Sequence, residues 1–344
     1  MSLPTRDVIG LMVDNLMKRN TVFPISRKKA TQWARDLDIP EGGRTVIYTG
    51  YMYQLLPYMI AAVKRMEMME GFSTSTWFGR LINFIILVMI KMGRFFNRII
   101  SVSGLISIPS KKDVKHYGQI IRNIALLLKK AGVEFGYLYK QELYAGALAH
   151  DVGADSAFAT HARRVYRMLK KNGVRSVITI DPHTTNMLRS VYPKIIEGYD
   201  IEVKSYLEVL AASDMKPVSN GNKKVTVHDS CVYARYEGVI EEPRELLRRG
   251  GYKVQEPRDA GYLTHCCGGP IESLFPAMAH KIGQKRVQQF RDANGDGVAT
   301  MCPICMATLQ KASEGDLQIQ DLSDFLLKAY CNGNQEPGGV VSND

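Results

Sequence analysis

Five of the six cysteines of this 344-residue chain lie in its C-terminal third, in three groups. The groups are Cys231, the adjacent pair Cys266 and Cys267, and the Cys-x-x-Cys formed by Cys302 and Cys305. Thiolate is the side chain that soft and borderline metals prefer, and the two sulfurs of a Cys-x-x-Cys can reach a single centre. The spacing therefore predicts a metal site that takes its sulfur ligands from three segments of the chain.

An iron-sulfur cluster, a zinc ion, a disulfide set or a thioredoxin-type pair could each use some of these cysteines. Tetrahedral zinc needs only four ligands, whereas a fifth cysteine, and especially an adjacent pair, suits a centre with several irons. Disulfides are typical of secreted proteins, and we expect no signal peptide here. A redox pair would use only Cys302 and Cys305. We expect an iron-sulfur cluster, with zinc as the main alternative, and Cys331 as a free thiol.

The cysteine pattern resembles that of a known domain. Its three parts are Cys231, then Cys266-Cys267-Gly268-Gly269-Pro270, then Cys302-Pro303-Ile304-Cys305. This order is similar to the cysteine-rich CCG domain of the B-type subunit of heterodisulfide reductase and of iron-sulfur subunits of lactate, glycolate, glycerol-3-phosphate and some succinate or fumarate oxidoreductases. The resemblance implies that the five cysteines bind the iron of one [4Fe-4S] cluster, of the noncubane type for which such a set is characteristic.

Members of that family usually carry two tandem copies, and a first copy is recognisable here without its cysteines. Three pairs of segments align between the copies: 44–53 with 224–233, 151–153 with 266–268, and 177–188 with 298–309. The five cysteine positions are occupied in the first copy by Tyr51, Asp151, Val152, Asp181 and Thr184. The resemblance therefore implies an α/β fold with two pseudo-symmetric lobes and a cluster only in the second. In heterodisulfide reductase, disulfide cleavage draws on a cluster in each lobe.

Several polar residues near these positions allow two interpretations. Those of the first copy are His150, Asp151, Asp181 and His183. They could form a site for a metal that prefers oxygen and nitrogen ligands or a proton-transfer pair for a quinone, but we expect polar turns. In the second copy His265, His228 and Asp229 could tune a cluster or be ordinary turn residues. We expect Gly268 to let peptide N–H groups approach the sulfurs.

A basic and apolar stretch in the first half is the second informative feature. Residues 71–112 contain no acidic residue and six Lys or Arg. A cationic amphipathic helix suits a membrane interface, and the uncharged run 81–90 is shorter than the roughly 20 residues that cross a bilayer. We expect membrane contacts from Trp77, Arg80, Phe84, Lys91, Arg94, Phe95 and Arg98. The alternative is a helix that packs on the protein core or on another subunit.

The charge and the motifs that are absent narrow the partners. The formal charge is +11, but the sequence has no zinc-finger spacing, no RNA-binding aromatic motif and no Lys/Arg block, so we expect no nucleic acid. It also has no flavin-binding glycine fingerprint and no ferredoxin-type cysteine run. We therefore expect a flavoprotein or iron-sulfur subunits of the same complex as partners, with a quinone or a disulfide as acceptor or donor.

We expect the chain to be organised around two sheets. β-branched stretches predict parallel strands, whose ends carry the site, at 44–48, 176–180, 224–228 and 297–301. The expected units are an N-terminal helical segment at 1–43, a first CCG-like lobe at 44–214 with the insertion 71–112, a second lobe with the cluster site at 223–331 and a disordered tail at 332–344.

The sequence as a whole predicts the iron-sulfur electron-transfer subunit of a membrane-associated, quinone-linked oxidoreductase complex. We expect it to lie as a peripheral protein on the cytoplasmic side of the membrane. The main alternative is a catalytic thiol-disulfide reductase in a soluble complex, similar to the B-type subunit of heterodisulfide reductase. A third hypothesis is a zinc-stabilised scaffold without redox activity.

Overall fold

The computed structural model describes residues 5–73, 108–272 and 275–332. All seven predicted membrane-contact residues, from Trp77 to Arg98, lie outside these ranges, as do residues 333–344 of the predicted tail. The membrane-interface helix and the disordered tail therefore stay predictions. Of the helices that the structure describes, none combines the length and the apolar character that crossing a membrane requires.

The first half of the chain forms helices around a four-stranded sheet. Its strands are β1 (Thr45–Tyr48), β2 (Gly136–Tyr137), β3 (Ser176–Thr179) and β4 (Glu202–Ser205). The helices before β1 are α1 (Thr5–Arg19), α2 (Arg27–Ala30) and the 3-10 turn η1 (Gln32–Ala34). Those between and after the strands are α3 (Met52–Ser73), α6 (Lys111–Lys130), η2 (Tyr139–Gln141), α7 (Ala147–Asp151), α8 (Asp155–Lys171), α9 (Pro182–Asn186), η3 (Met187–Val191), α10 (Tyr192–Ile195) and α11 (Tyr206–Ala211).

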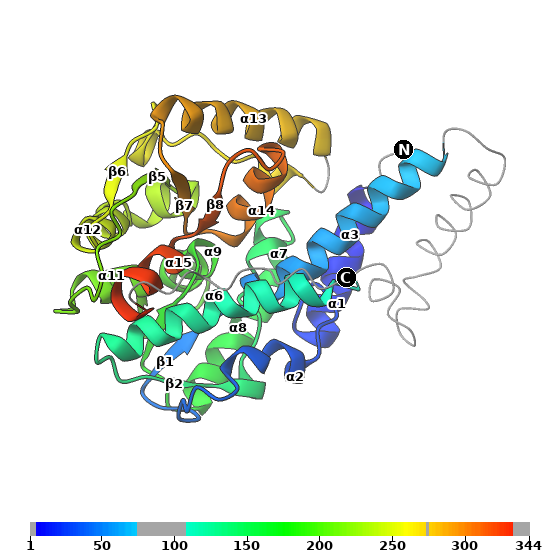
Figure 1. Cartoon of the computed structure of the whole chain (residues 1–344). Coiled ribbons are helices and arrows are strands. Elements are labelled where there is room, and N and C mark those ends of the chain that lie inside the picture. Colours follow the sequence, from blue (N-terminus) through cyan, green and yellow to red (C-terminus); the bar gives the residue numbers. More distant parts are fainter. Residues whose placement is uncertain (1–4, 74–107, 273–274, 333–344) are drawn as a thin grey trace.

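The second half repeats this plan. Its strands are β5 (Lys224–His228), β6 (Lys253–Gln255), β7 (Gly297–Thr300) and β8 (Ile319–Asp321). Its helices and turns are η4 (Tyr233–Glu237), α12 (Glu241–Arg249), η5 (Gly261–Leu263), η6 (Gly269–Ile271), α13 (Pro276–Ala293), α14 (Pro303–Ala312), α15 (Leu322–Leu327) and η7 (Lys328–Asn332). Figure 1 shows the second sheet beneath α13, and β1 and β2 at the opposite end of the molecule.

The two sheets share one topology and one register. The strand orders are β2-β1-β3-β4 and β6-β5-β7-β8, and all the pairs are parallel. Val46 pairs with Val177 in the first sheet, and Thr226 pairs with Val298 in the second. These are the residues that align between the two copies in the sequence. The prediction of two pseudo-symmetric α/β lobes is confirmed.

The four predicted strands are the central strands of the two sheets. β1, β3, β5 and β7 are buried along most of their length, as expected for parallel strands covered on both faces. The four edge strands were not predicted, because they are short and several carry charged residues. Glu202 and Lys204 of β4, for example, point two exposed charges away from an edge.

Both lobes contribute to a common core. Two clusters of buried apolar side chains each contain residues from the two sheets, one with Ile47 and Val227, the other with Val46 and Val298. The amphipathic helix α6 packs against α3 and α11 of the first lobe and against α15 of the second (Figure 1). Asn123 Nδ2 on α6 donates a hydrogen bond of 2.7 Å to Asp324 Oδ1 on α15.

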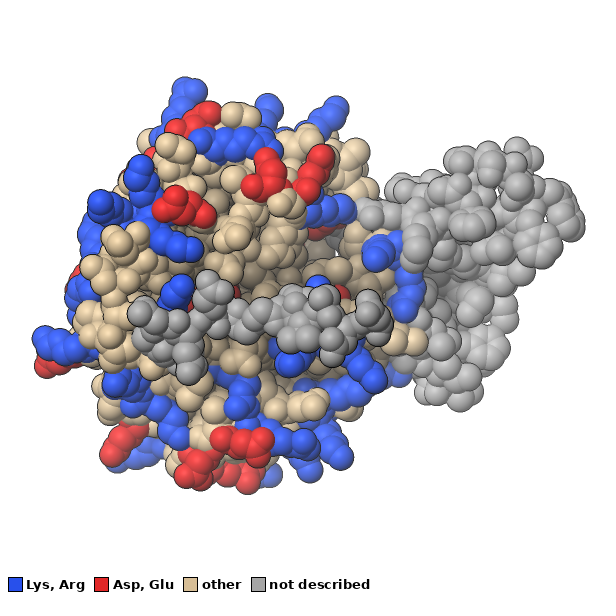
Figure 2. Space-filling model, in the orientation of Figure 1, with Lys and Arg blue, Asp and Glu red and all other residues tan. Residues whose placement is uncertain are grey.

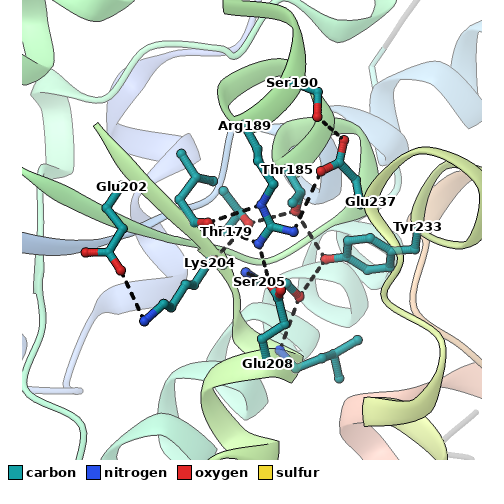
Figure 3. A network of polar contacts seen from close by, with 12 residues as sticks. Thr179, Thr185, Arg189, Ser190, Glu202, Lys204, Ser205, Glu208, Tyr233 and Glu237 are labelled. Carbon is teal, nitrogen blue, oxygen red and sulfur yellow. Dashed lines mark hydrogen bonds and ion pairs between the residues drawn. The ribbon is translucent and has the colours of Figure 1, made fainter. Parts of the chain in front are cut away.

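The lobes also exchange a pair of equivalent buried tyrosines. Tyr53 of the first lobe donates to Asp321 Oδ2 of the second at 2.6 Å. The hydroxyl of its counterpart Tyr233 lies 3.0 Å from Ser205 Oγ of the first lobe, as Figure 3 shows. Asp321 and Ser205 are the N-caps of α15 and α11, each at the end of the matching strand. The pseudo-symmetry therefore extends to the contacts between the lobes.

A second polar contact in Figure 3 adds to this interface. Glu237 of the second lobe accepts hydrogen bonds from Ser190 Oγ at 2.8 Å and Asn186 Nδ2 at 2.7 Å, and it lies 3.7 Å from Arg189 Nη1. These three residues belong to the first lobe, and Arg189 also pairs with Glu208 there. Because the interface is polar as well as apolar, the two lobes are held in one orientation.

Candidate metal centre

The predicted site lies at the carboxyl ends of the two central strands of the second lobe. Cys231 follows β5, and Cys302 follows β7 at the N-cap position of α14, with Cys305 in the first turn of that helix. Cys266 and Cys267 lie on the loop between η5 and η6. Adjacent parallel strands end at the same edge of a sheet, so β5 and β7 bring Cys231 and Cys302 to one place.

The five thiols form one chain of hydrogen-bonding contacts. In spatial order the chain is Cys231, Cys266, Cys267, Cys305 and Cys302. Three of them are buried, with side chains no more than 3% exposed, whereas Cys231 and Cys266 are half-buried. The structure thus brings all the predicted site residues together with one side open to the surface. Their role as cluster ligands stays a prediction.

The sulfurs in this chain do not share their protons equally. Hydrogen bonds from Cys231 and Cys267 lower the pKa of Cys266 to about 2. Burial raises the pKa of Cys302, but hydrogen bonds from Cys305 and His183 outweigh burial and hold it well below its ordinary value. The pKa values of the three donor thiols are raised, because each donates to a neighbouring sulfur. The site therefore holds negative sulfur in a mostly buried place, which suits a cationic metal.

Backbone N–H groups complete the surroundings of the cysteine pair. The amide of Gly268 lies 3.4 Å from Cys266 Sγ, and that of Gly269 lies 3.3 Å from Cys267 Sγ. Gly268 has φ +88°, and a Cβ there would lie 2.6 Å from the carbonyl oxygen of Ala279. Only glycine fits this turn without strain. The expectation that Gly268 lets peptide N–H groups approach the sulfurs is confirmed.

His183, from the first lobe, reaches the site. It is buried on α9 and makes a hydrogen-bonding contact with Cys302 of the second lobe. Its Nδ1 lies 3.4 Å from Asp151 Oδ2. Burial lowers the pKa of His183, but Asp151 and Cys302 outweigh it and raise the pKa well above its ordinary value. Sequence reasoning placed this residue in the first lobe, and no sequence signal showed that it contacts the second.

The other polar residues of the first copy lie apart from this contact. Asp181 caps α9 through a 2.9 Å hydrogen bond from the Thr184 amide, and burial raises its pKa to about 6. His150 stacks on Phe158, with ring centroids 4.9 Å apart. Within the described part of the chain, His150, Asp151, Asp181 and His183 do not form a group that could hold a metal ion. The interpretation as a metal site of the first copy therefore finds no support in the described residues.

His228 lies beside two of the cysteines but is not set to ligate a metal. One of its ring nitrogens is within 4.8 Å of the sulfurs of Cys267 and Cys305. Nδ1 accepts a hydrogen bond of 3.2 Å from Nε of the buried Arg286. Since arginine can only donate, the proton of the neutral imidazole must be on Nε2, and neither nitrogen offers a free lone pair. The buried Nε2 has no partner in the described structure, so it is an N–H donor available to an acceptor.

The last two residues with open roles have structural tasks. His265 Nδ1 contacts the carbonyl of Cys266 at 2.9 Å, which places the ring on the backbone of the cysteine pair. Asp229 accepts two hydrogen bonds from the buried Arg244, at 2.7 and 2.9 Å, and another from the amide of Gly261 at 2.7 Å. Asp229 thus ties the loop that carries the cysteine pair to the end of β5.

The donors present fit an iron-sulfur cluster. A tetrahedral zinc ion would leave one of the five contiguous thiols without a metal bond, whereas a centre with several irons can use all five. The amides of Gly268 and Gly269 and the unpartnered Nε2 of His228 supply N–H donors next to the sulfurs, as anionic clusters require. Cys331 lies elsewhere, packed against the shared apolar core.

Comparison with known families decides what this lobe is. Residues 225–310 match the family described as "CCG: Cysteine-rich domain", and the match contains all five cysteines. The second lobe is a CCG domain. The resemblance predicted from the cysteine pattern is confirmed. The first lobe lies outside the matched residues, in agreement with its lack of cysteines.

Several curated proteins are similar over a longer stretch. An "EtfAB:quinone oxidoreductase" of Syntrophomonas wolfei is 30% identical over 62% of this chain and 32% of its own length. A "probable membrane-anchored ferredoxin" of Chromohalobacter salexigens is 28% identical over 65% and 35%. One subunit of the dihydromethanophenazine-dependent heterodisulfide reductase of Methanosarcina barkeri is 26% identical over 59% and 53%. The chain thus spans about a third of the length of the first two relatives.

Proposed function

We propose that this protein is the electron-transfer subunit of an oxidoreductase complex and that its five clustered cysteines bind one [4Fe-4S] cluster of the noncubane type. The observation that carries the proposal is the unbroken chain of contacts from Cys231 to Cys302, drawn from three segments and closed on the inner side. Such a cluster, when bound, takes up and releases single electrons. The protein would hold it, shield it from water and adjust its potential.

The open side of the site supports exchange with a partner subunit. Cys231 and Cys266 are half-buried, and the turns next to them carry exposed apolar side chains. Tyr236, Tyr262 and Leu263 are 69%, 65% and 80% exposed, and the turns η4 and η5 that hold them are in contact. Exposed apolar groups of this size often mark interfaces. A flavoprotein or iron-sulfur subunit that covers them would bring its own cofactor close to the cluster.

The membrane part of the proposal rests on sequence and on the relatives. The stretch 71–112 is basic and apolar, and two relatives are named as a quinone oxidoreductase and a membrane-anchored ferredoxin. We propose that this stretch attaches the complex to the cytoplasmic face of the membrane, near the quinone. The overall charge gives no competing site on the face in Figure 2, where Lys and Arg are spread among acidic residues.

The cluster is tested by purifying the protein without oxygen. The proposal predicts about four irons and four sulfides per chain and an electron paramagnetic resonance signal upon oxidation or reduction. Protein that contains zinc and no iron would establish the scaffold hypothesis and refute electron transfer. Colourless protein without any metal would refute both.

Membrane attachment is tested with vesicles that contain anionic lipid. The wild-type protein should sediment with them, and replacing Arg94 and Arg98 by Glu should weaken binding by roughly tenfold or more, since each basic residue near the surface contributes about 1 kcal/mol. The matched control replaces Lys216 and Lys223, which are exposed on the segment between the lobes. Equal loss of binding in both variants would show an effect of net charge and contradict a specific attachment.

A thiol-disulfide reductase is the second candidate, because the half-buried Cys231 and Cys266 face the surface where a disulfide could approach. With one cluster, the protein lacks the second cluster on which disulfide cleavage in heterodisulfide reductase draws. Reduced protein that cleaves a small disulfide at a rate matching its electron supply would favour this candidate over the quinone-linked one.

A further inference from the structure

The lobe that has no cysteines supplies one residue to the site of the other lobe. His183 is buried at the start of α9, and its imidazole contacts the sulfur of Cys302 across the lobe boundary. Among the described residues outside the second lobe, His183 is the one whose side chain makes a hydrogen-bonding contact with a site cysteine. The pseudo-symmetry does not account for this contact, since the aligned residue of the second lobe, Ile304, is apolar.

The position of His183 is determined from two sides. Asp151 Oδ2 lies 3.4 Å from Nδ1 of the imidazole. Asp181, two residues earlier, caps α9 and thereby holds the first turn on which His183 lies. Asp151 and Asp181 occupy positions that hold cysteines in the second lobe, so two of the aligned ligand positions in the first lobe orient this histidine.

The chemistry of the two neighbours defines what the imidazole does. A carboxylate and a thiolate sulfur are both hydrogen-bond acceptors, so an imidazole between them presents N–H groups to both. An N–H group directed at a ligand sulfur stabilises the more negative, reduced form of an iron-sulfur cluster and so raises its reduction potential.

We propose that His183 is a positioning residue for the cluster, which donates a hydrogen bond to the sulfur of Cys302 and raises the reduction potential. Asp151 orients the imidazole for this contact. The first lobe thus takes part in the redox site without binding metal itself. The inference rests on the proposed function, because it requires Cys302 to be a cluster ligand.

The experiment measures the reduction potential of the anaerobically purified full chain by titration followed with electron paramagnetic resonance. His183→Leu removes the donor and should lower the oxidised-to-reduced midpoint by an amount equal to about a tenfold change in the ratio, or about 59 mV for one electron. His183→Gln keeps an N–H group and should recover part of the shift. Asp151→Asn, which weakens only the orientation, should give a smaller change in the same direction.

His150→Leu is the matched control. His150 belongs to the same lobe and lies next to Asp151 in the sequence, but its ring stacks on Phe158. Its replacement should leave the potential unchanged. A second measurement, electron nuclear double resonance in deuterated water, should show an exchangeable deuteron near the cluster that His183→Leu removes.

The outcomes separate this inference from the proposed function. Wild-type protein without iron would overturn both. A loaded wild type whose potential and deuteron signal are the same in His183→Leu would overturn only the role of His183. If His183→Leu loses its iron, the comparison of His183→Gln with the wild type decides, and a Gln variant that retains iron but lacks the deuteron signal and shows no shift would also overturn the inference.

Discussion

The two lobes have the same strands in the same order and register, yet one site holds five cysteines and the other holds none. At the N-cap after β3, Asp181 caps α9 with its side chain, whereas Cys302 at the equivalent position makes no cap bond. Aspartate is among the best N-cap residues, and cysteine is not. The second lobe therefore gives up local helix stabilisation and keeps a sulfur free, which indicates that its cysteines serve a ligand rather than the fold.

The first lobe fills the equivalent corner with hydrogen bonds. The buried carboxylate of Glu142 accepts bonds from the amides of Thr49 and Gly50, at 2.5 and 3.1 Å, and from the Tyr137 hydroxyl at 2.7 Å. Tyr51, at the position of Cys231, donates its hydroxyl to the Glu142 carbonyl at 2.8 Å. A carboxylate and a tyrosine thus stabilise here what a metal centre would connect in the other lobe.

Thr184, at the position of Cys305, closes this corner further. A Cβ on Gly50 would lie 2.0 Å from Thr184 Oγ1, so the side chain packs directly on the glycine. The comparison shows that this α/β topology folds without metal, and that a cysteine position can be filled by a side chain that packs or hydrogen-bonds instead.

The largest expected effect follows from removing one sulfur. Cys267→Ala interrupts the chain of thiols at its buried centre and should reduce bound iron and electron transfer by more than about tenfold, while the first lobe stays folded. Iron analysis and hydrogen exchange resolved by segment measure both. Cys331→Ala is the control, since Cys331 lies away from the site. Equal loss of exchange protection in both lobes would show that the metal is mainly structural.

The corresponding change in the first lobe should affect stability instead. Glu142→Ala leaves several buried donors without their acceptor, and each such donor costs about 1–3 kcal/mol. We expect the free energy of unfolding in urea to fall by about 3–5 kcal/mol, with the iron content per folded chain unchanged. A variant that loses iron as readily as Cys267→Ala would break the division of roles between the lobes.

A smaller effect concerns pH. Burial raises the pKa of Glu142 from its ordinary 4.5 to about 7, so the folded state binds more protons than the unfolded state between these values. Stability should therefore fall as pH rises from 4.5 to 7, by no more than about 3 kcal/mol from this residue. Other buried carboxyl groups with raised pKa values, such as those of Asp181 and Asp324, add to the slope.

Glu142→Gln tests this contribution, because it removes the titrating group. Urea unfolding at several pH values should show a shallower fall in the variant than in the wild type. An identical slope would mean that Glu142 is already ionised at low pH in the folded protein, which would contradict the effect of burial.

The sequence predicted the central strands, the two lobes and the five cysteines, because each leaves a local pattern. β-branched runs predict β1, β3, β5 and β7, and the cysteine spacing resembles one family. The edge strands left no such pattern, since β2 has only two residues and β4 is exposed and charged. The contact of His183 with Cys302 depends on how the lobes pack, and so does the network around Glu142. Neither can be read from the spacing of residues along the chain.

Iron X-ray absorption on anaerobically purified protein tests the central claim most directly, namely that the five thiols of the second lobe share one centre with several irons. The account predicts iron surrounded by sulfur, with scattering from neighbouring irons, and the loss of this pattern in Cys267→Ala but not in Cys331→Ala. Iron without iron neighbours, or zinc alone in the five-cysteine site, would contradict it.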